Sequence, residues 1–208
     1  ADGLIDEYVR DVSIIEGGKK VSVPALSGLE ELEFPGVGIL ESFYTDGLRT
    51  LADSIEGVES MWEKTLRYPG HVEKVKLLRE LGFFDDEPVR TRVGEVTPKD
   101  VTARIFERTL WMPDVGDLLA MRIEVSGMYK GAEKTHAYQL VDYFNHETGV
   151  SAMARTTGYT AAIVAAMLAK GMITEKGVLV TEKLAKNPGF TEGLLSELRK
   201  RGVRVEEI

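Results

Sequence analysis

Three short clusters of polar and aromatic residues carry the side chains of this sequence that could do chemistry. They are 44–49 (Tyr-Thr-Asp-Gly-Leu-Arg), 67–71 (Arg-Tyr-Pro-Gly-His) and 154–159 (Ala-Arg-Thr-Thr-Gly-Tyr). Each contains an arginine, which can hold a carboxylate through two parallel hydrogen bonds, and the first two add an acid or an imidazole that can exchange a proton. Each also falls at the end of a predicted strand or helix, where proteins often build their sites. These clusters therefore supply the candidate site residues.

The third cluster precedes the clearest helical segment of the chain, the Ala-rich run 160–170. Thr156 or Thr157 could cap this helix, and the free N–H groups of its first turn would then favour an anion, beside the fork of Arg155. The alternative is that the threonines only cap the helix and that Arg155 pairs with a surface acid. For the second cluster, the corresponding alternative is a turn whose aromatic ring packs and whose His71 caps the next helix.

Several familiar kinds of site are excluded by their motifs. The near match to a dinucleotide-binding turn, 36–41 (Gly-Val-Gly-Ile-Leu-Glu), lacks the third glycine and leads into a strand instead of following one. No glycine-rich loop ends in the Lys-Ser/Thr pair of an ATP-binding loop. The three histidines, His71, His136 and His146, are too scattered to suggest a metal site. We therefore expect no metal, and no residue of this sequence is assigned to cofactor binding.

The composition excludes further classes of protein. A chain of 208 residues that is 43% apolar can bury one sizeable core. Its net charge of −8, without a basic stripe, argues against nucleic acid as a partner, and the longest apolar run, 161–169, is too short to cross a membrane. The absence of cysteine excludes disulfides and thiolate sites and favours a reducing compartment. With no secretion or transit signal visible, we expect a cytoplasmic protein, and three side-chain amides beside 29% charged residues fit a thermophilic source.

Hydrophobic periodicity predicts an α+β domain in which a mixed β-sheet is covered by a few helices. The expected strands are 9–15 and 20–23 around a Gly-Gly turn, 39–44, the second half of 58–68, 119–125, 135–144 and 203–205. The expected helices are 48–55, 71–81 with Gly82 as its cap, 98–111 after a capping Thr97, 160–170 and 191–201. The segment 83–94 reads as an acidic loop.

At the same clusters the sequence resembles a known family. The strings 43–47 (Phe-Tyr-Thr-Asp-Gly), 65–71 (Thr-Leu-Arg-Tyr-Pro-Gly-His) and 154–159 (Ala-Arg-Thr-Thr-Gly-Tyr) occur in this order and resemble the C-terminal catalytic domain of the saccharopine dehydrogenase and lysine 6-dehydrogenase group. The opening 2–8 (Asp-Gly-Leu-Ile-Asp-Glu-Tyr) is similar to family sequence just after the nucleotide domain. The resemblance covers nearly the whole chain, and Thr-Leu-Arg-Tyr-Pro-Gly-His is its most specific string.

The resemblance implies a two-part enzyme. Its N-terminal Rossmann domain binds NAD or NADP, and its second domain, which this chain resembles, holds a small amino-acid substrate and forms a homodimer. The chain is then a fragment that lacks the Rossmann domain and is inactive alone. On this basis we expect a substrate-binding and dimerisation domain at 1–178, followed at 179–208 by a C-terminal helix and strand that return to the nucleotide-binding domain.

The implied reaction is oxidation of a lysine-type amine, in which a hydride passes to the nicotinamide and the resulting imine is hydrolysed. It requires a base near the amine, an anchor for the substrate carboxylate and walls that exclude water. The alternatives are a related carboxy-amine (polyamine-type) dehydrogenase and a non-catalytic dimeric interaction module. The candidates are His71 or Asp46 as the base, Tyr44 and Tyr68 as walls or hydrogen-bond donors, Arg155 with Thr156 as the anchor, and Arg67 as a further substrate contact.

Overall fold

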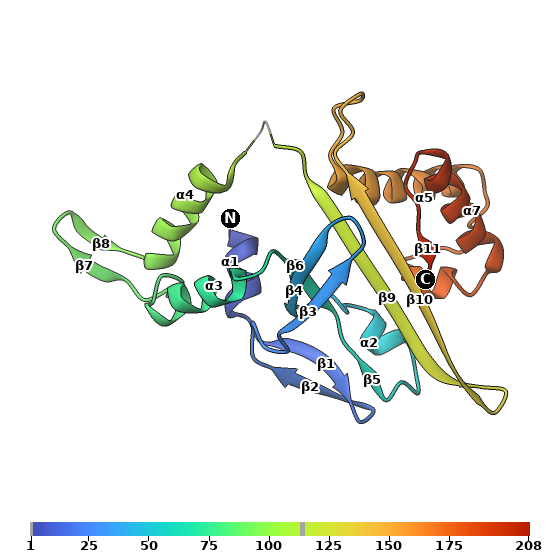
Figure 1. Cartoon of the computed structure of the whole chain (residues 1–208), viewed down its shortest axis with the longest axis horizontal. Helices are drawn as coiled ribbons and strands as arrows, with labels where there is room; N and C mark the ends of the chain where they lie inside the picture. Colours follow the sequence, from blue (N-terminus) through green and yellow to red (C-terminus); the bar gives the residue numbers. More distant parts are fainter. Residues whose placement is uncertain (1, 113–114) are drawn as a thin grey trace. The chain divides into compact units, whose positions relative to one another are not determined.

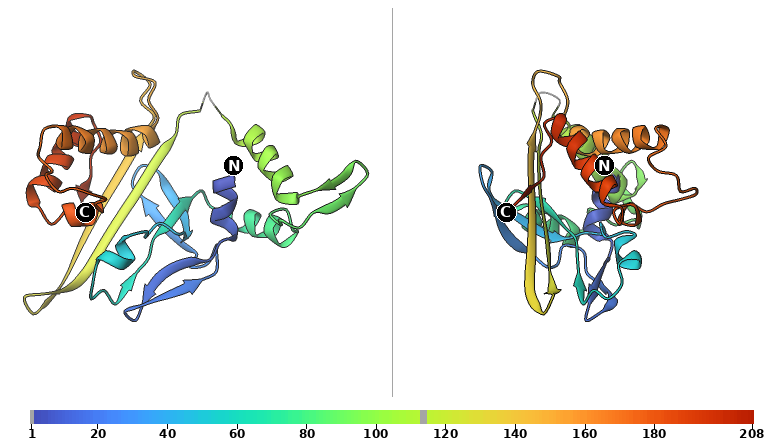
Figure 2. Two further views of the ribbon diagram at one scale, coloured as in Figure 1. Left: turned by 180° about the vertical axis from the view of Figure 1, so that it is seen from behind. Right: turned by 90° about the vertical axis from the view of Figure 1, so that its right-hand side faces the viewer.

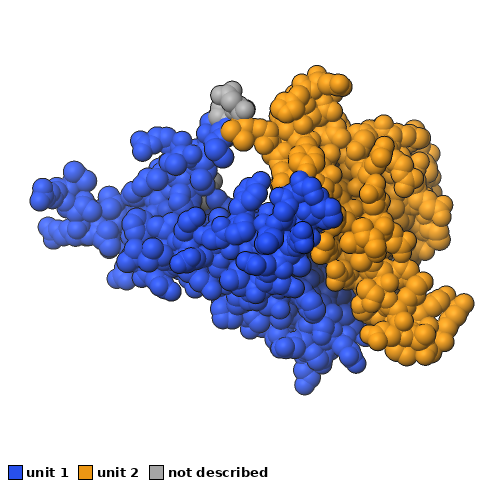
Figure 3. Space-filling view, in the orientation of Figure 1, with its two compact units in different colours: residues 1–112 blue, residues 113–208 orange. Residues whose placement is uncertain are grey.

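The computed structural model describes residues 2–112 and 115–208, and the chain divides into two compact units between residues 112 and 113 (Figure 3). Each unit has its own hydrophobic core.

Unit 1 combines short antiparallel strands with helices (Figure 1). Its strands form two three-stranded sheets, in the orders β2-β1-β5 and β3-β4-β6, and the separate hairpin β7-β8. The described elements are α1 (Asp2–Val9), β1 (Val12–Glu16), β2 (Lys19–Val23), β3 (Glu30–Phe34), β4 (Gly38–Tyr44), α2 (Leu51–Ser54), β5 (Ser60–Met61), β6 (Lys64–Arg67), α3 (His71–Glu80), β7 (Val89–Thr91), β8 (Gly94–Val96) and α4 (Pro98–Leu110).

Strand β4 is the central element of unit 1 for the candidate site. It pairs with β3 on one side and β6 on the other, so its residues 40–43 are buried. Phe43, with no exposed surface, joins the core of this unit. The other buried members of that core are Ile5, Tyr8, Leu26, Val72, Val75, Phe84 and Ala103. Helices α1 and α3 are therefore held beside β4 by apolar packing.

The helix predicted at 71–81 is confirmed, because α3 covers 71–80 and Gly82 follows it in the left-handed conformation at φ 80°. The segment 83–94, predicted as a loop, instead contains β7 and the start of β8. All three residues of β7 are exposed, and strands of three residues are too short for an alternation of apolar and polar residues to identify them. The Thr97 hydroxyl, predicted as a cap of α4, makes no capping hydrogen bond.

Unit 2 is built on a long hairpin of β9 (Leu118–Tyr129) and β10 (Ala132–Tyr143). The two strands pair without interruption across a turn at Lys130 and Gly131, whose φ angles of 52° and 82° suit a two-residue hairpin turn. The right panel of Figure 2 shows the helices of this unit on one face of the hairpin. The remaining elements are a π-helical turn (Ala154–Gly158), α5 (Tyr159–Ala169), α6 (Thr181–Leu184), α7 (Pro188–Lys200) and β11 (Glu206–Glu207).

The core of unit 2 lies between this hairpin and its helices. Its buried members are Leu140, Ile163, Met167, Ile173, Phe190, Leu198 and Val203. Strand β11 pairs with β10 at Tyr138 and Gln139. Residues 179–208 thus pack within unit 2 in this chain, while their return to a nucleotide-binding domain stays a prediction.

The predicted α+β class is confirmed. The strands differ from the expected mixed sheet, because every described pairing between them is antiparallel and the strands form four small sheets. Tight turns connect several neighbouring strands, and such turns allow only antiparallel pairing. Among the described helices, none combines the length and apolar character needed to cross a bilayer.

Candidate functional site

The predicted site residues divide between the two units. Tyr44, Asp46, Arg67, Tyr68 and His71 belong to unit 1, whereas Arg155 and Thr156 belong to unit 2. Within unit 1, the first group lies on the ends of β4 and β6, on the loops after them and at the start of α3.

His71 is the best-fixed member of the unit 1 group. Its Nε2 lies 3.0 Å from the hydroxyl of Tyr8 on α1. The imidazole stacks on Phe43 at 6.4 Å between ring centroids and is tilted against Tyr8 at 5.6 Å. Because Tyr8 is 1% exposed and Phe43 is fully buried, two core rings define the orientation of this histidine.

Glu41 holds the turn that leads into His71. Its Oε2 accepts a hydrogen bond from the Gly70 N–H at 2.8 Å, and its Oε1 accepts one from the Val72 N–H at 2.5 Å. The carboxylate thereby occupies the anion-favouring N-terminus of α3. Sequence reasoning missed this residue, although an acid in the middle of an apolar strand was a signal of a buried polar role.

Arg67 joins the end of β6 to α1. Its Nη2 donates to Oε2 of Glu7 at 3.2 Å, and its Nη1 donates to the carbonyl of Leu66 at 2.9 Å. Burial raises the pKa of Tyr8, and the charge of Arg67 opposes that rise. Arg67 and Tyr8 therefore form one polar group with His71.

The electrostatic surroundings keep His71 uncharged. Burial is the main cause that lowers the pKa of His71, and the charges of Arg67 and Lys74 lower it further, against the opposing effect of Glu41. Because the lowered value lies below the ordinary 6.5, the imidazole is neutral at pH 7.

The loop after β4 places Asp46 between two arginines. Its Oδ2 lies 3.3 Å from Nη1 of Arg49 and 3.9 Å from Nη2 of Arg10. Both contacts join opposite charges. The assignment of either Asp46 or His71 as the base stays a prediction.

Glu63 lies beside this loop and was also missed by sequence reasoning. Its Oε2 accepts a hydrogen bond from the Thr45 hydroxyl at 2.6 Å. Burial raises the pKa of Glu63, while that hydrogen bond and one from the Gly47 backbone oppose the rise. Its carboxylate would meet any side chain added at Gly47, since a Cβ there would lie 2.4 Å from Glu63 Cδ.

The two predicted aromatic walls differ in their exposure. The ring of Tyr44 covers Gly28, where a Cβ would lie only 2.3 Å from the ring, and Nζ of Lys64 lies 4.9 Å from the ring centroid. Tyr68 is 67% exposed. The ring of Tyr44 is therefore fixed against Gly28, whereas the ring of Tyr68 is open to solvent.

In unit 2, the guanidinium of Arg155 is buried and already paired. Its Nε lies 2.8 Å from Oδ2 of Asp142, and Nη2 donates to Asp142 Oδ1 at 3.4 Å and to the carbonyl of Arg201 at 3.3 Å. The hydrogen bond with Asp142 raises the pKa of Arg155 against the effect of burial. The alternative that Arg155 pairs with an acid agrees with this contact, but the expected surface position is wrong, because the residue is only 7% exposed. Its role as substrate anchor stays a prediction.

The predicted cap of the next helix is wrong. The helical conformation begins at Ala152, before the π-helical turn, and the Thr156 hydroxyl donates backwards to the Ala152 carbonyl at 2.9 Å. The carboxylate of Asp117 accepts from the N–H groups of Ala152 and Met153 at 2.7 and 2.9 Å, so it fills the expected anion position. Capping by an acid 35 residues away leaves no local signal in the sequence. Thr156 as a substrate contact stays a prediction.

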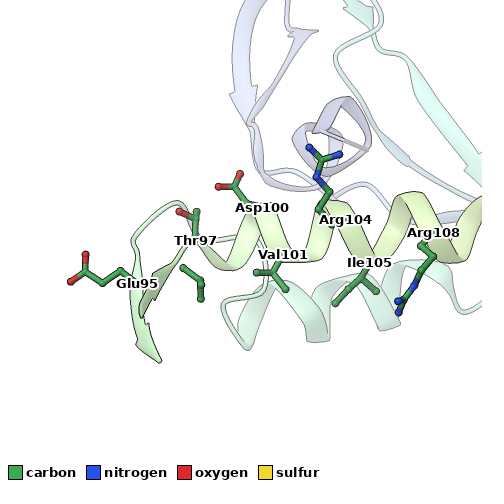
Figure 4. Close-up of a pocket in the computed structure, with 8 residues that line it drawn as sticks. Glu95, Thr97, Asp100, Val101, Arg104, Ile105 and Arg108 are labelled. Carbon is green, nitrogen blue, oxygen red and sulfur yellow. The ribbon is translucent and has the colours of Figure 1, made fainter. Parts of the chain in front are cut away.

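A shallow groove in unit 1 contains none of the predicted site residues. Figure 4 shows that its side chains project from α4 and the end of β8 without converging on one point. The lining residues are Glu95, Val96, Thr97, Asp100, Val101, Arg104, Ile105 and Arg108. Within the described ranges, no group of three or more His, Asp or Glu side chains is placed to hold a metal ion.

Comparisons with known proteins agree with the sequence resemblance. The family model described as saccharopine dehydrogenase C-terminal domain matches residues 1–203. The fold is similar to that of the apo histidine-tagged saccharopine dehydrogenase (L-Glu forming) from Saccharomyces cerevisiae, with a TM-score of 0.77 and 18% sequence identity. The alignment covers 100% of this chain and 60% of the yeast chain, so this chain spans less than two thirds of that protein. The family match over almost every residue shows that the chain belongs to the saccharopine dehydrogenase C-terminal domain family.

Proposed function

We propose that this chain is the substrate-binding and dimerisation part of an NAD(P)-dependent oxidoreductase that oxidises a lysine-type amine, acting as a lysine 6-dehydrogenase or a saccharopine dehydrogenase. Family membership supports the general class of amino-acid dehydrogenase. The observation that carries the proposal is the polar group of Tyr8, Arg67 and His71, which lies against the buried core of unit 1. Arg67 and His71 belong to the most specific string of the family resemblance.

The glycine turn at 36–38 does not fit a nicotinamide dinucleotide. Gly36 lies in the tight turn between β3 and β4, where the Val37 N–H bonds to the Phe34 carbonyl at 3.0 Å, and Gly38 begins β4. A dinucleotide site needs a strand, a glycine turn and a helix, and an antiparallel hairpin offers no helix N-terminus. The proposal therefore places the nicotinamide, which accepts the hydride, in an N-terminal domain of the whole protein.

The unit 1 group offers complementary contacts to an amino acid. Arg67 and neutral His71 can donate hydrogen bonds to a carboxylate, and the Asp46 carboxylate can accept a hydrogen bond from the substrate amine. Tyr44 and Tyr68 supply aromatic surfaces against which the substrate can pack. Such a set binds and orients an amine-bearing carboxylate and leaves the hydride to the nicotinamide.

The homodimer belongs to the same proposal. On β9, the apolar residues Ile123 and Val125 are 44% and 61% exposed, which leaves a sheet surface suited to a second copy. A stable dimer would bury on the order of 1,600 Å² in total. Sedimentation should then show a dimer at tens of micromolar protein, and a monomer at that concentration would contradict the proposed dimer.

The cysteine-free composition favours the cytoplasm for this enzyme.

The test is substrate-dependent reduction of NAD or NADP by the full-length protein, with lysine and saccharopine as substrates and product mass to distinguish them. Arg67→Ala should lower kcat/KM by about 10- to 150-fold, since a hydrogen bond to a charged group contributes roughly 1.5–3 kcal/mol. Arg67→Lys should rescue part of this loss. Arg92→Ala, at an exposed arginine between β7 and β8, is the matched control. Failure of the full-length protein to reduce either cofactor with any amine-bearing substrate would refute the proposal.

A further inference from the structure

The proton of the Tyr8 hydroxyl has one acceptor among the described residues. Because burial raises the pKa of Tyr8, the phenol keeps its proton at neutral pH. The hydroxyl faces His71 Nε2 at 3.0 Å and the guanidinium of Arg67, and a guanidinium can only donate hydrogen bonds. The O–H of this buried tyrosine must therefore point at Nε2, since a buried donor without an acceptor is costly.

This hydrogen bond fixes the protonation pattern of the imidazole. A nitrogen that accepts a hydrogen bond has no proton, so the single proton of neutral His71 resides on Nδ1. Within the described residues, Nδ1 has no hydrogen-bond partner, and the side chain is only half-buried. The N–H of Nδ1 remains available to a ligand.

The charged groups on the elements packed against His71 are consistent with a single proton on its ring. Arg67 on β6 and Lys74 on α3 are cations that oppose a second proton on the ring. Glu41 on β4 would favour that proton, but its two oxygens already accept from the Gly70 and Val72 N–H groups. Tyr8 on α1 completes the set.

We propose that Tyr8 is a positioning residue whose hydroxyl holds His71 as the Nδ1–H tautomer, so that the imidazole offers the substrate a hydrogen-bond donor instead of a base. The ligand atom that suits this donor is a carboxylate or carbonyl oxygen. The substrate contact rests on the proposed function, whereas the tautomer is a property of this chain. Removal of the amine proton then falls to a group other than His71.

Long-range ¹H–¹⁵N spectra of the labelled chain distinguish the two tautomers through the shifts of the ring nitrogens. We expect the Nδ1–H form for His71 in the wild type. Tyr8→Phe keeps the buried ring and removes the O–H, so the ratio of Nε2–H to Nδ1–H should rise by about 2- to 13-fold, the range given by a net 0.5–1.5 kcal/mol per hydrogen bond. The pKa of His71 should rise as well, because its Nε2 becomes free to take a proton.

The control is Tyr129→Phe, which removes a hydroxyl from an exposed tyrosine at the end of β9 and should leave His71 unchanged. An Nε2–H majority in the wild type, or an unchanged ratio in a folded Tyr8→Phe protein, would overturn the tautomer assignment.

Kinetics of the full-length protein test the donor role separately. An amide can donate a hydrogen bond but cannot act as a base, so His71→Asn should keep kcat/KM within about 10-fold of wild type while His71→Ala loses more. Equal losses in the two variants would overturn the donor role. If the full-length protein oxidises no amine but its spectra show the Nδ1–H form, the proposed function is refuted and the tautomer assignment is supported.

Discussion

The buried pair of Arg155 and Asp142 offers a direct test of what this arginine does. We expect Arg155→Met to destabilise the chain, because the variant leaves the Asp142 carboxylate buried without its partner. Methionine keeps most of the aliphatic stem that packs beneath the guanidinium, so the loss reports mainly on charge and hydrogen bonds.

The size of the effect follows from the burial of both side chains. They are 9% and 11% exposed, and removing one member of such a pair costs about 3–5 kcal/mol, against about 1 kcal/mol at most for an exposed pair. Arg155→Met with Asp142→Leu removes both charges together. The double variant should therefore lose less free energy of unfolding than the sum of the single variants, with a coupling of about 2–3 kcal/mol.

Urea denaturation of the four proteins, followed by circular dichroism, measures these free energies. A loss below about 1 kcal/mol in Arg155→Met would refute the structural role. If the same variant remained as stable as wild type and the full-length protein lost about 10- to 150-fold in kcat/KM, Arg155 would instead be the substrate anchor.

Three further predictions concern unit 1. Gly28→Ala should destabilise the chain by at least about 1 kcal/mol in denaturant titrations and should alter the fluorescence of Tyr44, because a Cβ at φ 64° would enter the tyrosine ring. Unchanged stability and fluorescence would contradict this packing. Burial raises the pKa of Glu63 above 4.5, so the stability that its protonated form contributes is present below that pH and is lost as pH rises through the raised value. Unfolding free energies measured across a pH series should show this loss in the wild type and not in Glu63→Gln. The pH dependence due to His71 has the opposite sign, because its pKa is lowered from 6.5. The stability that its neutral form contributes is present above that pH and is lost as pH falls through 6.5 toward the lowered value. The same slope of unfolding free energy against pH in His71→Asn would show that another group titrates.

Local patterns predicted the elements whose cause is local. The hairpin of β1 and β2 follows from two glycines with φ of 56° and 72° between β-branched runs, and α3 follows from apolar residues on one face and a glycine after its end. The long hairpin of β9 and β10 was also predicted, because apolar and polar residues alternate along β9.

Contacts between distant segments were beyond the reach of such patterns. Glu41 caps a helix 29 residues later in the chain, and Asp117 caps one 35 residues later. The apolar neighbours of Glu41 signal a buried acid but not its partner, and only the fold brings the oxygens of both acids to free N–H groups. The partner of Arg155 was missed for the same reason, since the pair forms only once β10 and the π-helical turn are packed together.

The π-helical turn at 154–158 also restricts how the length of this segment can change. Each residue of an α-helix turns the chain by about 100°, and the wider turn here shifts the two halves of the helix relative to each other. Deleting one residue of the turn would restore regular α-helix and rotate Ile163 and Met167 by about 100° relative to Arg155. Either the core or the ion pair with Asp142 would then be lost. Related sequences should accordingly tolerate substitutions in this turn more readily than single-residue deletions.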